Sequence, residues 1–189
     1  MNKVIEINAF LSLEAQLDIP NSATSLIIFA HGSGSSATSS RNQKVAQILN
    51  NNGFATLLFD LLNKEEQDSD IKTERIMHEL PGVTLNKFNI ELLTERLDAV
   101  TQWAQNNNDT KKLSIGYFGS STGAAAALYA ASSFRDIKAV VSRGGRTDLV
   151  DKKTLEEVKC SCLFIVGGND NKLIEINKMT IDQLTNVQA

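Results

Sequence analysis

The spacing of apolar residues along this chain changes regularly between two patterns. Short runs that are apolar almost throughout predict strands buried on both faces of a sheet, at 25–30 (SLIIFA), 54–62 (FATLLFDLL), 113–118, 137–141 and 162–166. Between them, apolar residues that recur every three or four positions predict helices, at 41–49, 89–104, 123–134, 154–158 and 173–185. Strands that alternate with helices are typical of an α/β fold, so we expect three layers: a mostly parallel sheet with helices on both faces.

Two segments depart from this alternation. Residues 3–7 and 11–18 alternate apolar and polar side chains one by one, which predicts an antiparallel hairpin at one edge of the sheet. Residues 63–85 are highly charged, include a proline and show no regular apolar spacing. We expect this stretch to be irregular, as a lid, a binding loop or a disordered segment, because it is long for a simple connection.

The composition is that of an ordinary globular protein. The chain has 189 residues, of which 42% are hydrophobic and 22% charged, which suits a single domain over 1–189 with one core. A net charge of −3 gives no reason to expect nucleic acid or an anionic membrane as a partner. The sequence has no run typical of a transmembrane span, and MNKVIEINAF lacks the features of a signal peptide, so a cytoplasmic location is expected.

The two cysteines of the chain, Cys160 and Cys162, are two positions apart on a predicted strand. A metal site needs more ligands than this, and a disulfide across so short a loop would be strained. We expect both to be small hydrophobic side chains at the start of the strand, and we expect no metal and no organic cofactor.

The stretch GSSTG at 119–123 lies between a predicted strand and a predicted helix. In that context, G-x-S-x-G is typical of a nucleophile elbow, a strained turn that exposes the middle serine at the carboxyl edge of the sheet. Side chains at Gly119 and Gly123 would collide with the backbone that crosses there, which explains the spacing. Ser121 is therefore the predicted nucleophile. The alternative is a turn of small residues that only packs a helix onto the sheet.

A second glycine-rich segment, HGSGSS at 31–36, follows the central predicted strand. A loop in this position can direct a backbone N–H group toward the nucleophile, and with the N–H of the residue after the serine it forms an oxyanion hole. Ser33 and Thr122 are the predicted donors, and His31 is expected to anchor the loop. Two alternatives are a flexible turn without function and a phosphate loop of a nucleotide-binding protein. The absence of G-x-x-x-x-G-K-[ST] and G-x-G-x-x-G disfavours the second.

Charged residues at the ends of later strands complete the candidate site. Asp170 follows a predicted strand in VGGND, where it could orient an imidazole, and Asp148 in SRGGRTDL is the second choice. The alternative for Asp170 is a cap on the helix that follows. Arg41 and Arg143 are candidate contacts for a substrate carboxylate, and otherwise ordinary surface arginines.

Taken in order, HGSGSS, Arg41-Asn42, FATLLFDLL, GSSTG, SRGGRTDL and VGGND resemble the dienelactone hydrolase-like family of α/β-hydrolases. The resemblance implies an esterase or lactonase with a nucleophile, an acid and a histidine, and an α/β-hydrolase-type sandwich. It also implies a small-molecule ester or lactone as substrate. Dienelactone hydrolase itself has a cysteine where this chain has Ser121, which weakens the case for dienelactone as the substrate.

The histidine that this resemblance implies is missing from the expected place. It should follow the acid by one more strand, but the 19 residues after Asp170 contain no histidine and are too few for a further strand, loop and helix. We therefore expect a C-terminally truncated fold. His78 is the candidate base, from its own chain or from a partner, because its loop emerges at the same edge of the sheet as Ser121.

Without a base, a serine hydrolase loses turnover by a factor on the order of 10⁴ to 10⁶. We therefore expect a hydrolase that is weak or inactive in this form, and the alternative is a catalytically silent binding protein on the same fold. The predicted strand 162–166 would also be an open edge of the sheet. A homodimer through that edge is a further expectation.

Overall fold

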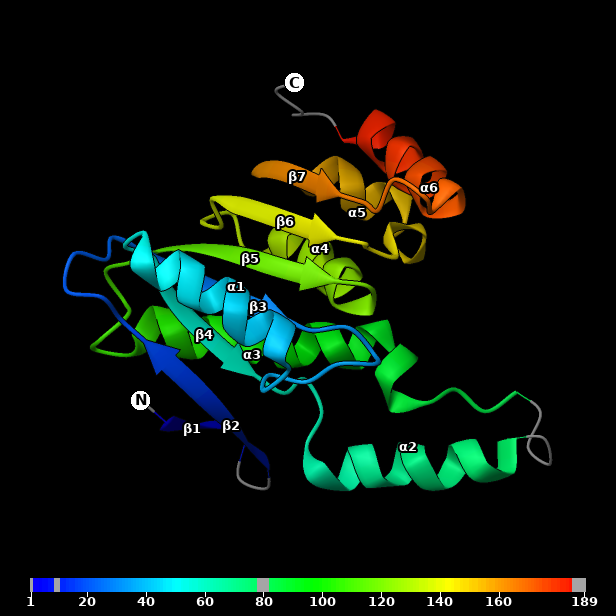
Figure 1. Ribbon diagram of the computed structural model, residues 1–189, viewed down its shortest axis with the longest axis horizontal. Helices are drawn as coiled ribbons and strands as arrows, with labels where there is room; N and C mark the ends of the chain where they lie inside the picture. Colours follow the sequence, from blue (N-terminus) through cyan, green and yellow to red (C-terminus); the bar gives the residue numbers. More distant parts are fainter. Residues whose placement is uncertain (1, 9–10, 78–81, 185–189) are drawn as a thin grey trace.

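The fold is known from a computed structural model that describes residues 2–8, 11–77 and 82–184. The described strands join one sheet in the order β1-β2-β4-β3-β5-β6-β7 (Figure 1). Their bounds are β1 Asn2–Asn8, β2 Leu11–Asp18, β3 Ser25–Ala30, β4 Ala55–Phe59, β5 Ser114–Ser120, β6 Ala139–Arg143 and β7 Ser161–Ile165. The pairs from β4 to β7 are parallel, whereas β1 pairs with β2, and β2 with β4, in antiparallel fashion. The mostly parallel sheet with an N-terminal antiparallel hairpin is confirmed.

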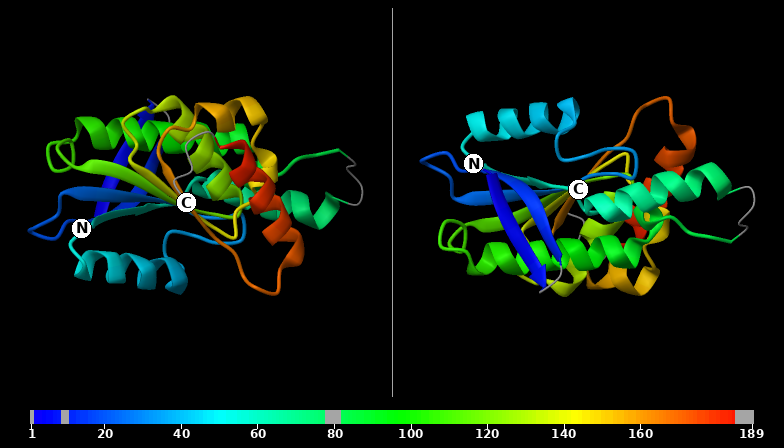
Figure 2. Two further views of the ribbon diagram at one scale, coloured as in Figure 1. Left: turned by 90° about the horizontal axis from the view of Figure 1, so that it is seen from above. Right: turned by 90° about the horizontal axis from the view of Figure 1, so that it is seen from below.

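Helices cover both faces of this sheet, as the sequence predicted. Their bounds are α1 Ser40–Asn51, α2 Lys64–Ile76, α3 Ile90–Asn106, α4 Thr122–Ser133, α5 Lys152–Glu157 and α6 Asn171–Gln183, with short 3-10 helices η2 Asn86–Phe88 and η3 Thr147–Leu149. Figure 2 shows α1 on one face and α3, α4 and α5 on the other. The larger apolar core lies under α3 and α4, and a smaller one, which includes Phe29 and Leu58, lies under α1. Among the described helices, none combines the length and the apolar character needed to cross a membrane.

The expectation of an irregular stretch at 63–85 is wrong for its first half, which forms α2. The helix begins with a capping box, in which Asn63 and Glu66 each accept a hydrogen bond from the other's backbone N–H. The helix has no apolar stripe because it does not pack on the core: Asp70 is its only buried residue. That carboxylate accepts backbone N–H groups from Asn86 at 2.8 Å and from Lys87 at 2.9 Å, and so joins α2 to η2.

The last strand in the order, β7, leaves one edge of the sheet unpaired within the described part of the chain. Alternate residues of a strand face opposite sides of a sheet. Cys162 and Phe164 pack against the larger core, whereas Leu163 and Ile165 on the other side are 56% and 47% exposed. The expected open edge is therefore present, and its uncovered face is apolar.

Candidate active site

The GSSTG segment forms a strained turn between β5 and α4. Ser121 has φ 51° and ψ −123°, and among the described residues other than glycine it alone has a positive φ. A Cβ atom at Gly119 would lie 2.6 Å from the Cα of Ala124, and one at Gly123 would lie 2.1 Å from the carbonyl oxygen of Ala30. Both positions therefore require glycine, which confirms the reason given for the spacing.

Two loops hold this turn in place. The loop after β3 passes so close that a Cβ at Gly32 would lie 2.8 Å from the Cβ of Ser121. The carbonyl oxygen of Ser121 accepts N–H groups from Ala124 and from Arg146, in the loop after β6, each at 3.1 Å. The side chain of Ser121 is half-buried, so it is fixed by its backbone and still accessible.

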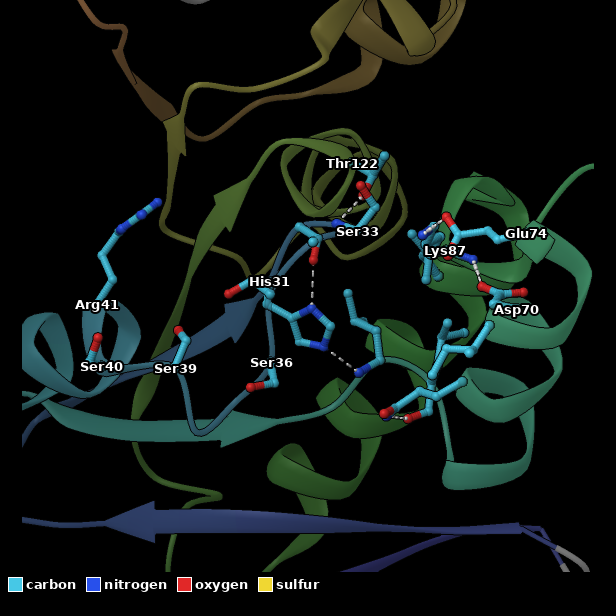
Figure 3. A pocket seen from close by; sticks show the side chains of 18 residues that line it. His31, Ser33, Ser36, Ser39, Ser40, Arg41, Asp70, Glu74, Lys87 and Thr122 are labelled. Carbon is cyan, nitrogen blue, oxygen red and sulfur yellow. Dashed lines mark hydrogen bonds and ion pairs between the residues drawn. The ribbon is translucent and has the colours of Figure 1, made fainter.

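The two predicted oxyanion donors, Ser33 and Thr122, lie next to each other and are joined by a hydrogen bond. The backbone N–H of Ser33 donates to Oγ1 of Thr122 at 3.1 Å (Figure 3). Thr122 is 2% exposed and is the first residue of α4, where the helix N-terminus favours negative charge. The amide of Ser33 thus already has an acceptor within the protein.

His31 anchors the loop, as expected. Its Nε2 accepts the backbone N–H of Leu61 at 3.0 Å, so Nδ1 carries the ring hydrogen and donates to the carbonyl oxygen of Gly32 at 3.0 Å. In Figure 3 the ring lies between the two loops that follow β3 and β4. Both ring nitrogens are occupied by backbone groups, so this histidine is not available to take a proton from Ser121.

A cavity of about 460 Å³ adjoins Thr122 and extends between the loop after β3 and helix α2 (Figure 3). One wall is rich in hydroxyl groups, from Ser33, Ser35, Ser36, Ser39 and Ser40. The opposite wall includes Asp70, Glu74 and Lys87. This space next to the elbow is large enough for a small-molecule substrate.

Arg41 and Arg143 form a positively charged pair near the elbow. Arg143 ends β6 beside Ser120, and Arg41 lies in the first turn of α1 and lines the cavity. Burial, followed by the charge of Arg41, lowers the pKa of Arg143. Within the described residues, neither arginine forms an ion pair with a carboxylate, and the Nε of Arg143 is buried without a hydrogen-bond partner. This arrangement is suited to an anionic group supplied by a ligand.

The candidate acids are engaged in local contacts. Asp170 is the N-cap of α6 and accepts the N–H of Leu173 at 3.1 Å, the alternative that the sequence left open. Asp148 accepts two hydrogen bonds from the Arg146 guanidinium, each at 2.8 Å, which lowers the pKa of that carboxyl. The candidate base, His78, lies outside the described residues. In the described part of the chain, no imidazole is hydrogen-bonded to Ser121 or to either acid.

Residues 13–188 match the dienelactone hydrolase family. The chain belongs to the dienelactone hydrolase family. It is similar to a crystal structure of dienelactone hydrolase from Anabaena variabilis, with a TM-score of 0.89, 41% sequence identity, and coverage of 100% of this chain and 86% of that one. It also superposes on Est1E from Butyrivibrio proteoclasticus with a TM-score of 0.76 at 18% identity, over 99% of this chain and 86% of that one. At that identity the likeness shows the α/β-hydrolase fold alone.

A curated protein of Mycobacterium tuberculosis is 47% identical to this chain over 163 residues. The match covers 86% of this chain but 33% of the relative, so the chain spans about a third of the length of the curated relatives it matches. The relative is provisionally named a phosphoribosyl transferase. Because most of that protein lies outside the match, its name assigns no activity to the part that is shared.

Sequence reasoning missed two features of this hydrolase-family site. The wall of the cavity formed by α2 was missed because the stretch lacks an apolar period, although Asn63 and Glu66 are spaced as a capping box. The second is Asp60, after β4, which accepts the N–H of Ala37 at 2.7 Å and lies 3.4 Å from the Nε2 of His31. No local sequence pattern indicates that contact, because it joins loops that follow different strands.

Proposed function

We propose that this protein is a serine-dependent hydrolase of carboxylic esters or lactones, with Ser121 as its nucleophile. The observation that carries the proposal is the left-handed backbone of Ser121, held by neighbours that admit only glycine at two positions. Such strain persists where the surrounding structure imposes it, and it is concentrated at active sites. In the reaction, Oγ of Ser121 attacks the substrate carbonyl, the ester C–O bond breaks, and the serine proton passes to the alcohol oxygen, which departs from an ester and stays attached to the acyl group of a lactone. Water then cleaves the acyl-enzyme.

The paired arginines favour a substrate that carries a carboxylate. Among the described residues the buried Nε of Arg143 has no hydrogen-bond partner, and Arg41 adds to the positive charge around it, so a bound anion would relieve their repulsion. Hydrogen bonds between a guanidinium and a carboxylate are stronger than those between neutral groups. An ester or lactone with a free acid group next to the reacting carbonyl would satisfy both the nucleophile and this pair.

The proposed reaction needs a group that accepts the proton of Ser121. His31 is committed to two backbone groups, which leaves His78 as the histidine that could serve as base, with Asp170 as its orienting acid. We infer slow turnover, because Asp170 already caps α6 and no imidazole in the described part of the chain is hydrogen-bonded to Ser121. Loss of one member of a catalytic triad costs a factor on the order of 10⁴ to 10⁶.

The test is hydrolysis of 4-nitrophenyl acetate by the protein and by Ser121→Ala and His78→Ala. Release of nitrophenol that Ser121→Ala abolishes supports the proposal, and its loss in His78→Ala identifies the base. Equal rates for the protein and Ser121→Ala would overturn it. For the carboxylate, the same enzyme is compared on the acetate and on the 4-nitrophenyl monoester of succinic acid. Arg143→Gln should raise KM for the charged ester by about tenfold or more and leave the neutral one unchanged.

One observation favours a second candidate, a protein that binds small acids or esters without turnover. It is the commitment of His31 to backbone groups, with both candidate acids engaged in contacts of their own. Binding of succinate or its monoester by calorimetry, lost in Arg143→Gln and accompanied by no hydrolysis, would support this second function.

A further inference from the structure

The contact between Ser33 and Thr122 defines how an oxyanion would be bound here. In the usual arrangement, two backbone N–H groups point at the oxygen of the tetrahedral intermediate. Here the N–H of Ser33 is already directed at Oγ1 of Thr122, 3.1 Å away. Oγ1 thus belongs to Thr122, the same residue whose backbone N–H is the other predicted donor.

The Thr122 hydroxyl has a hydrogen to give. A hydroxyl oxygen can accept hydrogen bonds and donate one. Oγ1 accepts from Ser33, and in the described part of the chain its hydrogen has no protein acceptor. Thr122 lines the cavity beside the elbow. A hydroxyl that accepts a hydrogen bond is polarised, so it donates more strongly to a third group.

We propose that the Thr122 hydroxyl, and not the Ser33 amide, is the second donor to the oxyanion. Ser33 is then a positioning residue that acts through Thr122, by fixing its hydroxyl rotamer and polarising it. Thr122 supplies both donors, its backbone N–H and its Oγ1–H, and no proton is transferred to the substrate oxygen. This inference rests on the proposed role of Ser121 as nucleophile.

The obvious alternative predicts the opposite result for one substitution. If the Ser33 amide were the donor, Thr122 would have to rotate away, and Thr122→Val would free the amide and keep or increase the rate. If the hydroxyl is the donor, Thr122→Val should lower kcat on the order of 10²-fold with KM little changed, as loss of one oxyanion donor does. Thr122→Ser keeps the hydroxyl, so it should stay within a few-fold of the unchanged protein.

Two readouts make the test decisive. The first is the rate at which 4-nitrophenyl acetate acylates Ser121, followed by nitrophenol release and by the mass of the acyl-protein. The second is the affinity for phenylboronic acid, which forms a tetrahedral anion on a serine and needs no turnover. Both should weaken in Thr122→Val and in Thr122→Ala, and both should be preserved in Thr122→Ser. Circular dichroism and urea unfolding check that the variants fold, and Thr122→Ala replaces Thr122→Val if valine does not fit.

The outcomes separate the two proposals. Ser121-dependent acylation or boronate binding that Thr122→Val and Thr122→Ala leave unchanged or improve overturns the role of the hydroxyl alone. If the unchanged protein forms neither the acyl-enzyme nor the boronate adduct, the proposed function itself fails, and the role of Thr122 fails with it. Equal losses in Thr122→Ser and Thr122→Val would also overturn the inference, because they would show a need for threonine packing and not for the hydroxyl.

Discussion

A Cβ atom at Gly123 would lie 2.1 Å from the carbonyl oxygen of Ala30, so the first turn of α4 contacts the end of β3 directly. Glycine is needed here for approach and not for an unusual φ, since Gly123 is not among the glycines with positive φ. Both partners are backbone, which cannot be moved by a change of rotamer. The close contact brings the residue after Ser121 within reach of the loop that follows β3.

The first prediction concerns this contact. Gly123→Ala should lower the free energy of unfolding by about 3 kcal/mol or prevent folding, because the added methyl group overlaps backbone atoms that cannot yield. Urea unfolding followed by circular dichroism measures the effect. Gly34→Ala is the matched control, since a Cβ there meets no atom within 4 Å. An unfolding midpoint for Gly123→Ala equal to that of Gly34→Ala would contradict the prediction.

The second prediction concerns Asp98 on α3. One oxygen of its carboxyl group is buried and has no hydrogen-bond partner in the described part of the chain. Burial, and then the charge of Glu95, raise the pKa of Asp98 to about 6. The folded protein therefore binds this proton more tightly than the unfolded chain, whose pKa is about 4. Between about pH 4 and pH 6, the contribution of Asp98 to the free energy of unfolding falls as pH rises.

Asp98→Asn removes the charge and keeps the shape. Below about pH 4, the variant and the unchanged protein should have nearly the same free energy of unfolding. The advantage of the variant should grow toward pH 6 and level off at about 1 kcal/mol above it, after allowance for solvent screening. Thermal unfolding at a series of pH values gives the difference. Glu95→Gln, which removes the second cause, should move the transition to lower pH. If the free energies of unfolding of Asp98→Asn and of the unchanged protein differed by the same amount at every pH, a raised pKa of Asp98 could not be the cause.

The third prediction concerns His31. His31→Phe keeps the ring but leaves the N–H of Leu61 without its acceptor, which should cost about 2 kcal/mol of stability. His31→Gln, which retains a donor and an acceptor, should recover part of the loss. Urea unfolding of both variants is the measurement. If the His31→Phe variant were as stable as the unchanged protein, the ring of His31 would serve only to fill space.

The fourth prediction concerns the edge at β7, which no strand in the described part of the chain pairs with. We propose that a second copy of this chain pairs with it, because exposed backbone N–H and C=O groups beside apolar side chains favour strand addition. Val141 of β6 lies next to Leu163 on the uncovered face, so the apolar surface continues inward from the edge. Light scattering at micromolar concentration should give the mass of a dimer. Leu163→Lys should give a monomer, and Met179→Lys, at another exposed site, should not. A monomeric parent protein would count against the proposal.

The strands and most helices could be predicted because elements that pack on the core have apolar residues at regular spacings. β3 was predicted with its observed bounds, and the charged helix α2 was missed because it packs through Asp70 and not through an apolar face. At the site, the glycines around Ser121 are imposed by contacts of fixed geometry, so their spacing was informative. The hydrogen bond from Ser33 to Thr122 depends on the path of a loop, and residue types alone do not determine such a path.

The attachment of α2 has a consequence for how this protein could change. The helix forms one wall of the cavity, yet it is tied down by polar contacts such as the Arg96–Glu66 ion pair of 2.7 Å, and it shares little with the apolar core. Ile71 of α2 lines the cavity and is 47% exposed, so its substitution can alter which molecules fit while the free energy of unfolding stays almost the same. The turn around Ser121 offers no such freedom, because added side chains at Gly119 and Gly123 would overlap backbone atoms. Selection, natural or in the laboratory, can therefore change the shape of the cavity through α2 while the backbone of the turn at Ser121 stays as it is.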